Sequence, residues 1–239
     1  MKIRQAWLIL LLASGLPDAA SCHAEGVLDH LLGFLGISAS PSQMKGPRDT
    51  VDSGEIWIAP LAEGNSTQVG GGAGFRWPIF APGGQSVLAL AGETLVSIPV
   101  TGGPPKSLHS LPGVEKLVGF AKGDVDKLLL LRANQGGGWE IGVLSLASGK
   151  IADIAHDPQQ DRRLLAHLRG HERVYDGIKL YLKTETKPSV TGGQTEWIEV
   201  YAKQGDAPPR RVSRCDGSDC AQPSLSADGS KIVFIKGQP

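Results

Sequence analysis

Hydrophobic and polar residues alternate in short segments from about residue 54 to the end of the chain. This alternation predicts β-strands with two different faces. Four of the segments resemble one another, and each is followed by a turn and a second short strand. They are residues 55–61, 93–100, 139–146 and 196–203. The pattern therefore predicts four hairpins of one kind.

Further pairs of apolar segments lie between these hairpins. They are residues 77–80 with 87–90, 117–120 with 127–131, 164–168 with 178–182, and 223–225 with 231–235. The last pair has no hairpin after it and the first hairpin has no pair before it, so each supplies what the other lacks. We therefore expect an all-β fold, a small β-propeller with four blades of four antiparallel strands, closed by pairing of its N- and C-terminal strands. Such pairing leaves no apolar strand edge bare. A β-sandwich is the alternative fold, and a fifth blade within residues 161–214 is left open.

The N-terminal residues have the pattern of an export signal. Lys2 and Arg4 precede an apolar run at residues 6–13, and small residues follow as far as Ala24. This run is too short to span a bilayer, so residues 1–24 are predicted to be a signal peptide of a periplasmic or secreted protein. A lipid anchor at Cys22 is the alternative. No later apolar run is long enough for a transmembrane segment.

Two further regions follow the predicted signal peptide. Residues 25–52 are expected to form a short amphipathic helix, at 25–37, and a polar linker. Residues 53–239 are expected to form the propeller domain. The chain has 24 Lys and Arg against 24 Asp and Glu, and this zero net charge argues against a nucleic-acid-binding protein. Hydrophobic residues make up 41%, enough for a sizeable core.

Two stretches share a motif with a known repeat. They are RWPIFAPGGQSVLAL at residues 76–90 and AQPSLSADGSKIVFI at residues 221–235. Both resemble the WD40-like repeat of the TolB-like propeller family. Ser226, Asp228 and Gly229 match the core of that repeat, and Pro82 and Gly84 match it in part, whereas the other two predicted blades keep only the turn and the strand. The resemblance implies a propeller of the kind that serves as a periplasmic scaffold, as part of a peptidase or as a neutralising partner of a secreted toxin. TolB itself has an N-terminal α/β domain, and the stretch before the predicted propeller is too short for one.

The chemical motifs of the chain are few. Cys215 and Cys220 lie close enough in RCDGSDC to form a local disulfide, which an oxidising compartment would favour. Zinc and weak calcium binding at this loop are the alternatives, but no nearby histidine completes a zinc site. No nucleophile elbow, zinc-protease motif or phosphate-binding loop occurs in the sequence. We therefore predict no catalytic residues, no metal and no cofactor.

A binding surface is expected on the face of the propeller that carries its longest loops. The segment 184–195 is predicted to be the longest of these. The residues expected to contribute are Trp77, Arg162, Arg163, Lys187 and Pro188. These features favour a non-enzymatic protein-binding module, either a scaffold or an immunity protein that inhibits a toxic enzyme. The alternative is a small propeller lyase or hydrolase that uses Asp161, Arg162, His167 and His171 at the mouth of the channel.

Overall fold

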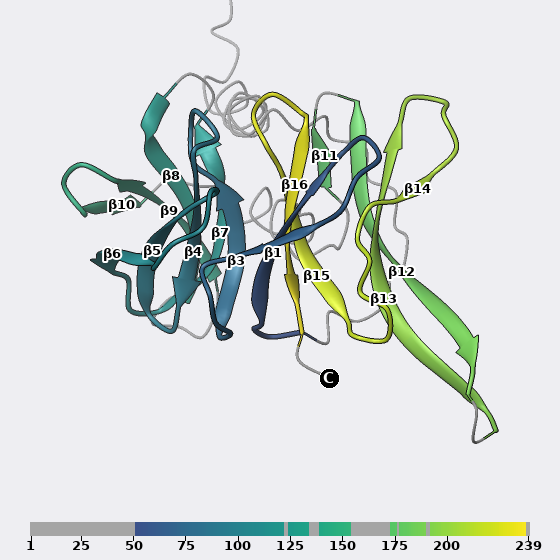
Figure 1. Cartoon of the computed structure of the whole chain (residues 1–239). Helices are drawn as coiled ribbons and strands as arrows, with labels where there is room; N and C mark the ends of the chain where they lie inside the picture. The colour runs from purple at the N-terminus through teal and green to yellow at the C-terminus, as the bar shows by residue number, and fades with distance from the viewer. Residues whose placement is uncertain are drawn as a thin grey trace, which may run out of the picture.

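The computed structural model describes residues 51–121, 124–133, 139–153, 173–175, 177–189 and 192–237. These residues form four antiparallel sheets of four strands each, so the all-β prediction is confirmed (Figure 1). The predicted signal peptide, the helix at 25–37 and most of the linker lie outside the described residues. Within the described part of the chain, no helix has the length and hydrophobicity needed to cross a bilayer.

Three of the sheets are continuous in sequence, and their strands follow one another in chain order. The first contains β3 (Phe75–Phe80), β4 (Ser86–Ala91), β5 (Thr94–Pro99) and β6 (Lys106–Ser110). The second contains β7 (Val114–Ala121), β8 (Asp124–Ala133), β9 (Trp139–Ser145) and β10 (Ile151–Asp153). The third contains β11 (Arg173–Tyr175), β12 (Ile178–Pro188), β13 (Gln194–Gln204) and β14 (Arg210–Arg211).

The fourth sheet joins the two ends of the strand-forming region. Its order is β15 (Cys220–Leu225), β16 (Lys231–Lys236), β1 (Glu55–Pro60) and β2 (Thr67–Val69). The ladder between β1 and β16 is unbroken from Glu55 opposite Lys236 to Pro60 opposite Lys231. The predicted pairing of N- and C-terminal strands is therefore confirmed, and it places the otherwise unmatched hairpin beside the otherwise unmatched strand pair.

Neighbouring sheets pack through their first strands. Strand β3 contacts β7 on one side and β15 on the other, and β15 also contacts β11, β12 and β13. One apolar core fills the space around the shared sheet and its two neighbours, with the fully buried Phe234 and Ile56 among its members. A second core lies between the first and second sheets and includes Leu90 and Leu128. This arrangement is propeller-like, and closure of the four sheets into a ring stays a prediction.

The two stretches that share the repeat motif form the same turn. In the C-terminal copy the amide of Ser226 donates to the carbonyl of Lys231, and the amide of Gly229 donates to the carbonyl of Ser226, both at 2.9 Å. In the N-terminal copy the amides of Ala81 and Gly84 make the two equivalent bonds, to the carbonyls of Ser86 and Ala81, again at 2.9 Å. The internal repeat is therefore structural as well as sequential.

The aspartate of the C-terminal turn explains why this motif carries an acidic residue. The Ser226 hydroxyl donates to Asp228 Oδ1 at 2.6 Å, and the amide and hydroxyl of Ser230 donate to the same carboxylate at 3.0 and 2.8 Å. These donors favour the ionised carboxylate, the Ser226 hydroxyl most, and lower the pKa of Asp228 to about 2. Gly229 follows at a φ of 69°, which a residue with a Cβ rarely adopts.

The third sheet differs from the prediction in two respects. The strand that pairs with the beginning of β12 is β11, whereas the strand predicted at 164–168 lies outside the described residues. The prediction of a long loop at 184–195 is wrong, because β12 continues to Pro188 and β13 already begins at Gln194. Alternating Thr residues suit an extended strand, and Gly192 and Gly193, at φ values of 88° and 93°, confine the reversal to a short turn.

Candidate functional site

A small open pocket lies where the first strands of all four sheets meet. Strands β3, β7, β11 and β15 each contribute to its wall. The lining residues are Trp77, Pro78, Ile79, Lys116, Leu117, Val118, Tyr175, Gln222, Pro223 and Ser224. We call this the central pocket. In a propeller-like arrangement the first strands surround the axis, so the pocket lies where all four sheets fix its shape.

Two of the lining strands carry the same backbone distortion. Trp77 in β3 and Gln222 in β15 have φ values of 50° and 54°, and each directly precedes a proline. The register of each strand shifts at this point, between Arg76 and Ile79 in β3 and correspondingly in β15. A non-glycine residue in this conformation costs on the order of 1 kcal/mol, and bulges commonly redirect a side chain next to a functional site. The repeat therefore uses the same bulge twice to direct side chains at the pocket.

Gln222 holds the two bulged strands together. Its Oε1 accepts a hydrogen bond from the backbone N–H of Trp77 at 2.5 Å. Its Nε2 donates to the backbone carbonyl of Val51 at 3.0 Å. Because Gln222 is only 6% exposed, these bonds replace water that the burial has removed. The amide thus joins β15, β3 and the segment that precedes β1.

Lys116 brings a cationic group to the pocket. Its Nζ lies 4.0 Å from the centroid of the Trp77 ring, a cation–π contact. Lys116 is 5% exposed, and its aliphatic stem is packed while its ammonium reaches the indole. The pocket therefore combines an ammonium, an indole and a side-chain amide, with Tyr175 on the wall. This set suits binding by stacking and hydrogen bonding. Among the described lining residues no carboxylate or imidazole could serve as a general base.

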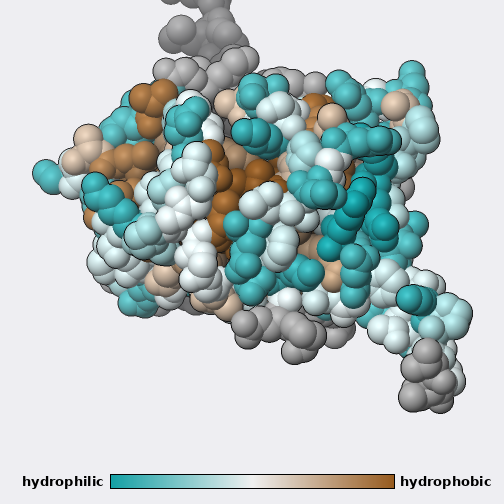
Figure 2. All heavy atoms as spheres, in the orientation of Figure 1, coloured by the Kyte–Doolittle hydropathy of each residue, from teal (hydrophilic) through white to brown (hydrophobic). Residues whose placement is uncertain are grey.

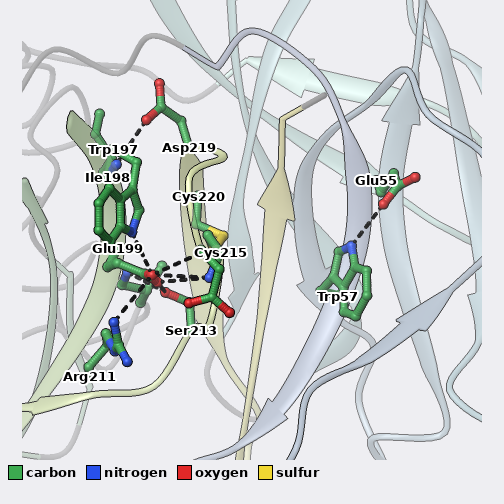
Figure 3. The surroundings of a disulfide bond; sticks show 12 residues. Glu55, Trp57, Trp197, Ile198, Glu199, Arg211, Ser213, Cys215, Asp219 and Cys220 are labelled. Carbon is green, nitrogen blue, oxygen red and sulfur yellow. Dashed lines mark hydrogen bonds and ion pairs between the residues drawn. A yellow bond between two sulfur atoms is a disulfide. The ribbon is translucent and has the colours of Figure 1, made fainter. Parts of the chain in front are cut away.

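The disulfide predicted between Cys215 and Cys220 is present, with the two Cα atoms 6.1 Å apart (Figure 3). It spans the connection from β14 to β15 and so links the third sheet to the shared sheet. A pairing this short in sequence stabilises by roughly 2 kcal/mol. The prediction of this bond and of its place in the fold is confirmed.

A fully buried carboxylate, that of Glu199, lies beside the disulfide (Figure 3). It accepts hydrogen bonds from Trp197 Nε1 at 2.8 Å, from the Ser213 hydroxyl at 2.5 Å and from the Cys215 amide at 3.0 Å. Arg211 adds an ion pair at 3.7 Å. The carboxylate is therefore saturated with donors, and its role is to fix the segment that carries the disulfide onto β13.

The sulfur atoms and the Glu199 carboxylate lie within 4.8 Å of one another, a spacing that a metal ion could bridge. However, Cys215 and Cys220 are bonded to each other, and metal coordination by cysteine requires thiolates. In the same loop Asp219 Oδ1 accepts a hydrogen bond from the Ile198 amide at 2.8 Å. This loop is therefore built as a structural junction.

The structure describes three of the five residues that the sequence placed on one surface. Trp77 lines the central pocket. Lys187 and Pro188 are exposed at the end of β12 and are not among the lining residues. Arg162 and Arg163 lie outside the described residues, as do the Asp161, His167 and His171 of the enzymatic alternative.

Sequence reasoning missed Lys116, Tyr175 and Gln222. One signal for Gln222 was available. In the two repeats RWPIF and AQPSL, Trp77 and Gln222 occupy the same position directly before the proline. For Lys116 no comparable signal exists, because its strand keeps the turn of the repeat but not the proline.

Comparisons with known proteins do not assign a family. No family model and no curated protein matches the chain. Among solved structures, the chain is similar to a putative TolB from Agrobacterium tumefaciens, with 14% identity, 74% of this chain and 59% of that chain covered, and a TM-score of 0.34. It is also similar to the isopeptidase AtxE2 in its apo form, with 11% identity, coverage of 63% and 28%, and a TM-score of 0.25. The chain thus spans less than two thirds of either structure, and the description of the fold rests on its own strand pairing.

Proposed function

We propose that the protein is an exported β-propeller that acts as a non-enzymatic protein-binding module, with the central pocket as its recognition site. The observation that carries this proposal is the contact between the Lys116 ammonium and the Trp77 indole at the meeting point of the four first strands. Tryptophan and tyrosine are among the residues that dominate protein recognition, and a lysine beside an indole adds a charged group to such a site. A protein partner that covers the mouth of the pocket would pack against the indole and reach the lysine.

The disulfide supports an extracytoplasmic location, because structural disulfides persist in oxidising compartments. The N-terminal sequence pattern also supports export. The signal peptide would be cleaved after Ala24, or, in the alternative, the protein would be lipidated at Cys22. In the periplasm such a module would serve as a scaffold of an envelope complex or as an immunity-type inhibitor of a toxic enzyme. Arg162, Arg163, Lys187 and Pro188 would extend the contact surface beyond the pocket.

The proposal is tested by affinity capture with matched baits. The wild-type protein and its Lys116→Met variant, which keeps the aliphatic stem and loses the charge, are incubated with periplasmic extract of the host. Lys106→Met is the control, since Lys106 is exposed on β6, the last strand of its sheet. We expect one stoichiometric protein captured by the wild type and by Lys106→Met, and lost with Lys116→Met. Equal capture by all three baits would exclude the central pocket as the site.

A further inference from the structure

Strands β12 and β13 extend beyond their own sheet as a two-stranded arm. Each has 11 residues, whereas β11 pairs only with Ile178 to Leu180, and β14 only with Tyr201 and Ala202. We call residues 181–188 and 194–200 the arm. Leu182, Ile198 and Val200 at its base are buried in the core, and its outer part projects away from the four sheets in Figure 1, where Figure 2 shows a largely hydrophilic protrusion.

The backbone groups of β12 alternate between the two sides of the strand. The amide of Gly205 donates to the carbonyl of Gly177 at 3.3 Å, and the amide of Ser189 donates to the carbonyl of Gly193 at 3.1 Å. Gly177 and Ser189 flank β12, and both bonds show that the backbone groups of odd-numbered residues in this segment point toward β13. Since neighbouring residues of a strand point their peptide groups in opposite directions, Leu182, Thr184 and Thr186 point theirs away from β13.

The two edges of the arm differ in whether their outward backbone groups have hydrogen-bond partners. On β13 the outward amides of Ile198 and Val200 are bonded to Asp219 Oδ1 at 2.8 Å and to the Ser213 hydroxyl at 2.7 Å. On β12, no described strand pairs with the segment beyond Leu180. Leu182 is buried, whereas Thr184 and Thr186 are exposed and present a short open edge, a template for another strand.

The charges along this edge select a register for a second copy of the same edge. Lys183, Glu185 and Lys187 alternate with the outward-facing residues, so their side chains would meet across an antiparallel junction. With Thr184 opposite Thr184 of the second copy, Lys183 lies opposite Glu185 of the second copy, and the reverse pair forms by symmetry. Lys187 then lies opposite Tyr181, where a cation–π contact is available.

The other registers that align the outward-facing groups are less favourable. Centring the junction on Lys183 places that lysine against itself. Centring it on Glu185 places that glutamate against its own copy and also places Lys183 opposite Lys187. Centring it on Thr186 also places Glu185 opposite Lys187, but it places Thr184 opposite Pro188, which has no N–H to donate. The register centred on Thr184 is therefore the one that combines opposite charges with a Thr pair that can donate and accept in both directions.

We propose that two copies of this protein associate through the β12 edges of their arms, antiparallel and centred on Thr184. This association goes beyond the proposed function and does not depend on it, because it needs no partner protein and leaves the central pocket outside the interface. The two arms would form one four-stranded sheet across a two-fold axis, an isologous contact.

Sedimentation velocity of the purified protein over a range of concentrations tests the proposal. The wild type is expected to show a monomer–dimer equilibrium. Lys183→Glu and Glu185→Lys each put like charges opposite each other twice per dimer, so each should weaken the dimer by about tenfold or more. The double variant K183E/E185K restores both opposite-charge pairs and also keeps the pairing within each copy, where Lys183 Nζ lies 2.8 Å from Glu185 Oε1. It should dimerise like the wild type.

An equimolar mixture of the two single variants gives the sharpest result. In the mixed dimer each glutamate meets a lysine, so the mixture should dimerise like the wild type although each variant alone dimerises about tenfold or more weakly. Circular dichroism of each variant confirms that the fold is kept. A monomeric wild type at all concentrations, or a dimer that both single variants retain, would overturn the proposal. Neither result would affect capture of a partner through Lys116, so the two proposals fail separately.

Discussion

Replacement of Gln222 by Ala tests how the central pocket is held together. The variant removes both hydrogen bonds of the amide and leaves the Trp77 N–H and the Val51 carbonyl without their partner. Gln222 and Val51 are only 6% and 7% exposed, so water cannot replace the amide without a rearrangement. An unpaired buried polar group costs roughly 1–3 kcal/mol. The variant leaves two such groups, the Val51 carbonyl and the partly buried Trp77 N–H, so we expect a loss of about 3 kcal/mol in the free energy of unfolding.

Urea denaturation followed by tryptophan fluorescence measures this loss, because the midpoint shifts while the slope stays constant if only stability has changed. Gln68→Ala is the matched control. Gln68 is exposed on β2, and its replacement should change the free energy of unfolding by less than about 0.5 kcal/mol. A Gln222→Ala variant within about 1 kcal/mol of the wild type would refute the claim that this amide joins the bulged strands.

Three further perturbations address other parts of the fold. Replacing Cys215 and Cys220 together by Ser should lower the free energy of unfolding by about 2 kcal/mol in urea denaturation without reductant, and an unchanged midpoint would contradict the role given to the disulfide. Asp228→Asn should lower stability at neutral pH. The pKa of Asp228 falls from 3.8 to about 2 on folding, so its contribution to stability is complete above about pH 4 and is lost as the pH falls through 2. The free energy of unfolding of the variant should therefore change less with pH over that window. Identical pH profiles of the variant and the wild type would contradict this. Gly54→Ala should destabilise the protein by about 3 kcal/mol in thermal or urea unfolding, because its Cβ would clash with the Lys236 carbonyl oxygen, and a neutral effect would contradict the close approach of Gly54 to β16.

The strand pattern could be predicted from the sequence because alternation and turn residues are local signals. The hairpin predicted at residues 93–100 appears as β5 and β6, and the closing strand predicted at 231–235 appears as β16. Pairing of the first and last strands could be predicted by counting the hairpins and strand pairs, since one hairpin and one strand pair were each left without a counterpart. These inferences depend on the order of residues along the chain, which the sequence gives directly.

The central pocket could not be predicted to the same extent. Trp77 was predicted to contribute to the binding surface, whereas Lys116 and Gln222 are polar residues in strands whose sequences do not indicate that these side chains are buried. Their placement depends on how separate sheets meet, and that contact is decided by packing across the whole domain. The arm was misread for a related reason, because Thr and Lys residues between two strands look like a loop when the pairing of residues 183 with 199 and 188 with 194 is not known.

The most direct test of the proposed function is hydrogen exchange of the protein with and without the captured partner. Our account predicts that the partner slows exchange in the segments that line the central pocket, residues 76–79, 114–118 and 220–224. The last strands of the sheets, β2, β6, β10 and β14, should exchange at unchanged rates. Protection confined to these last strands, with no change around the pocket, would contradict the assignment of the central pocket as the recognition site.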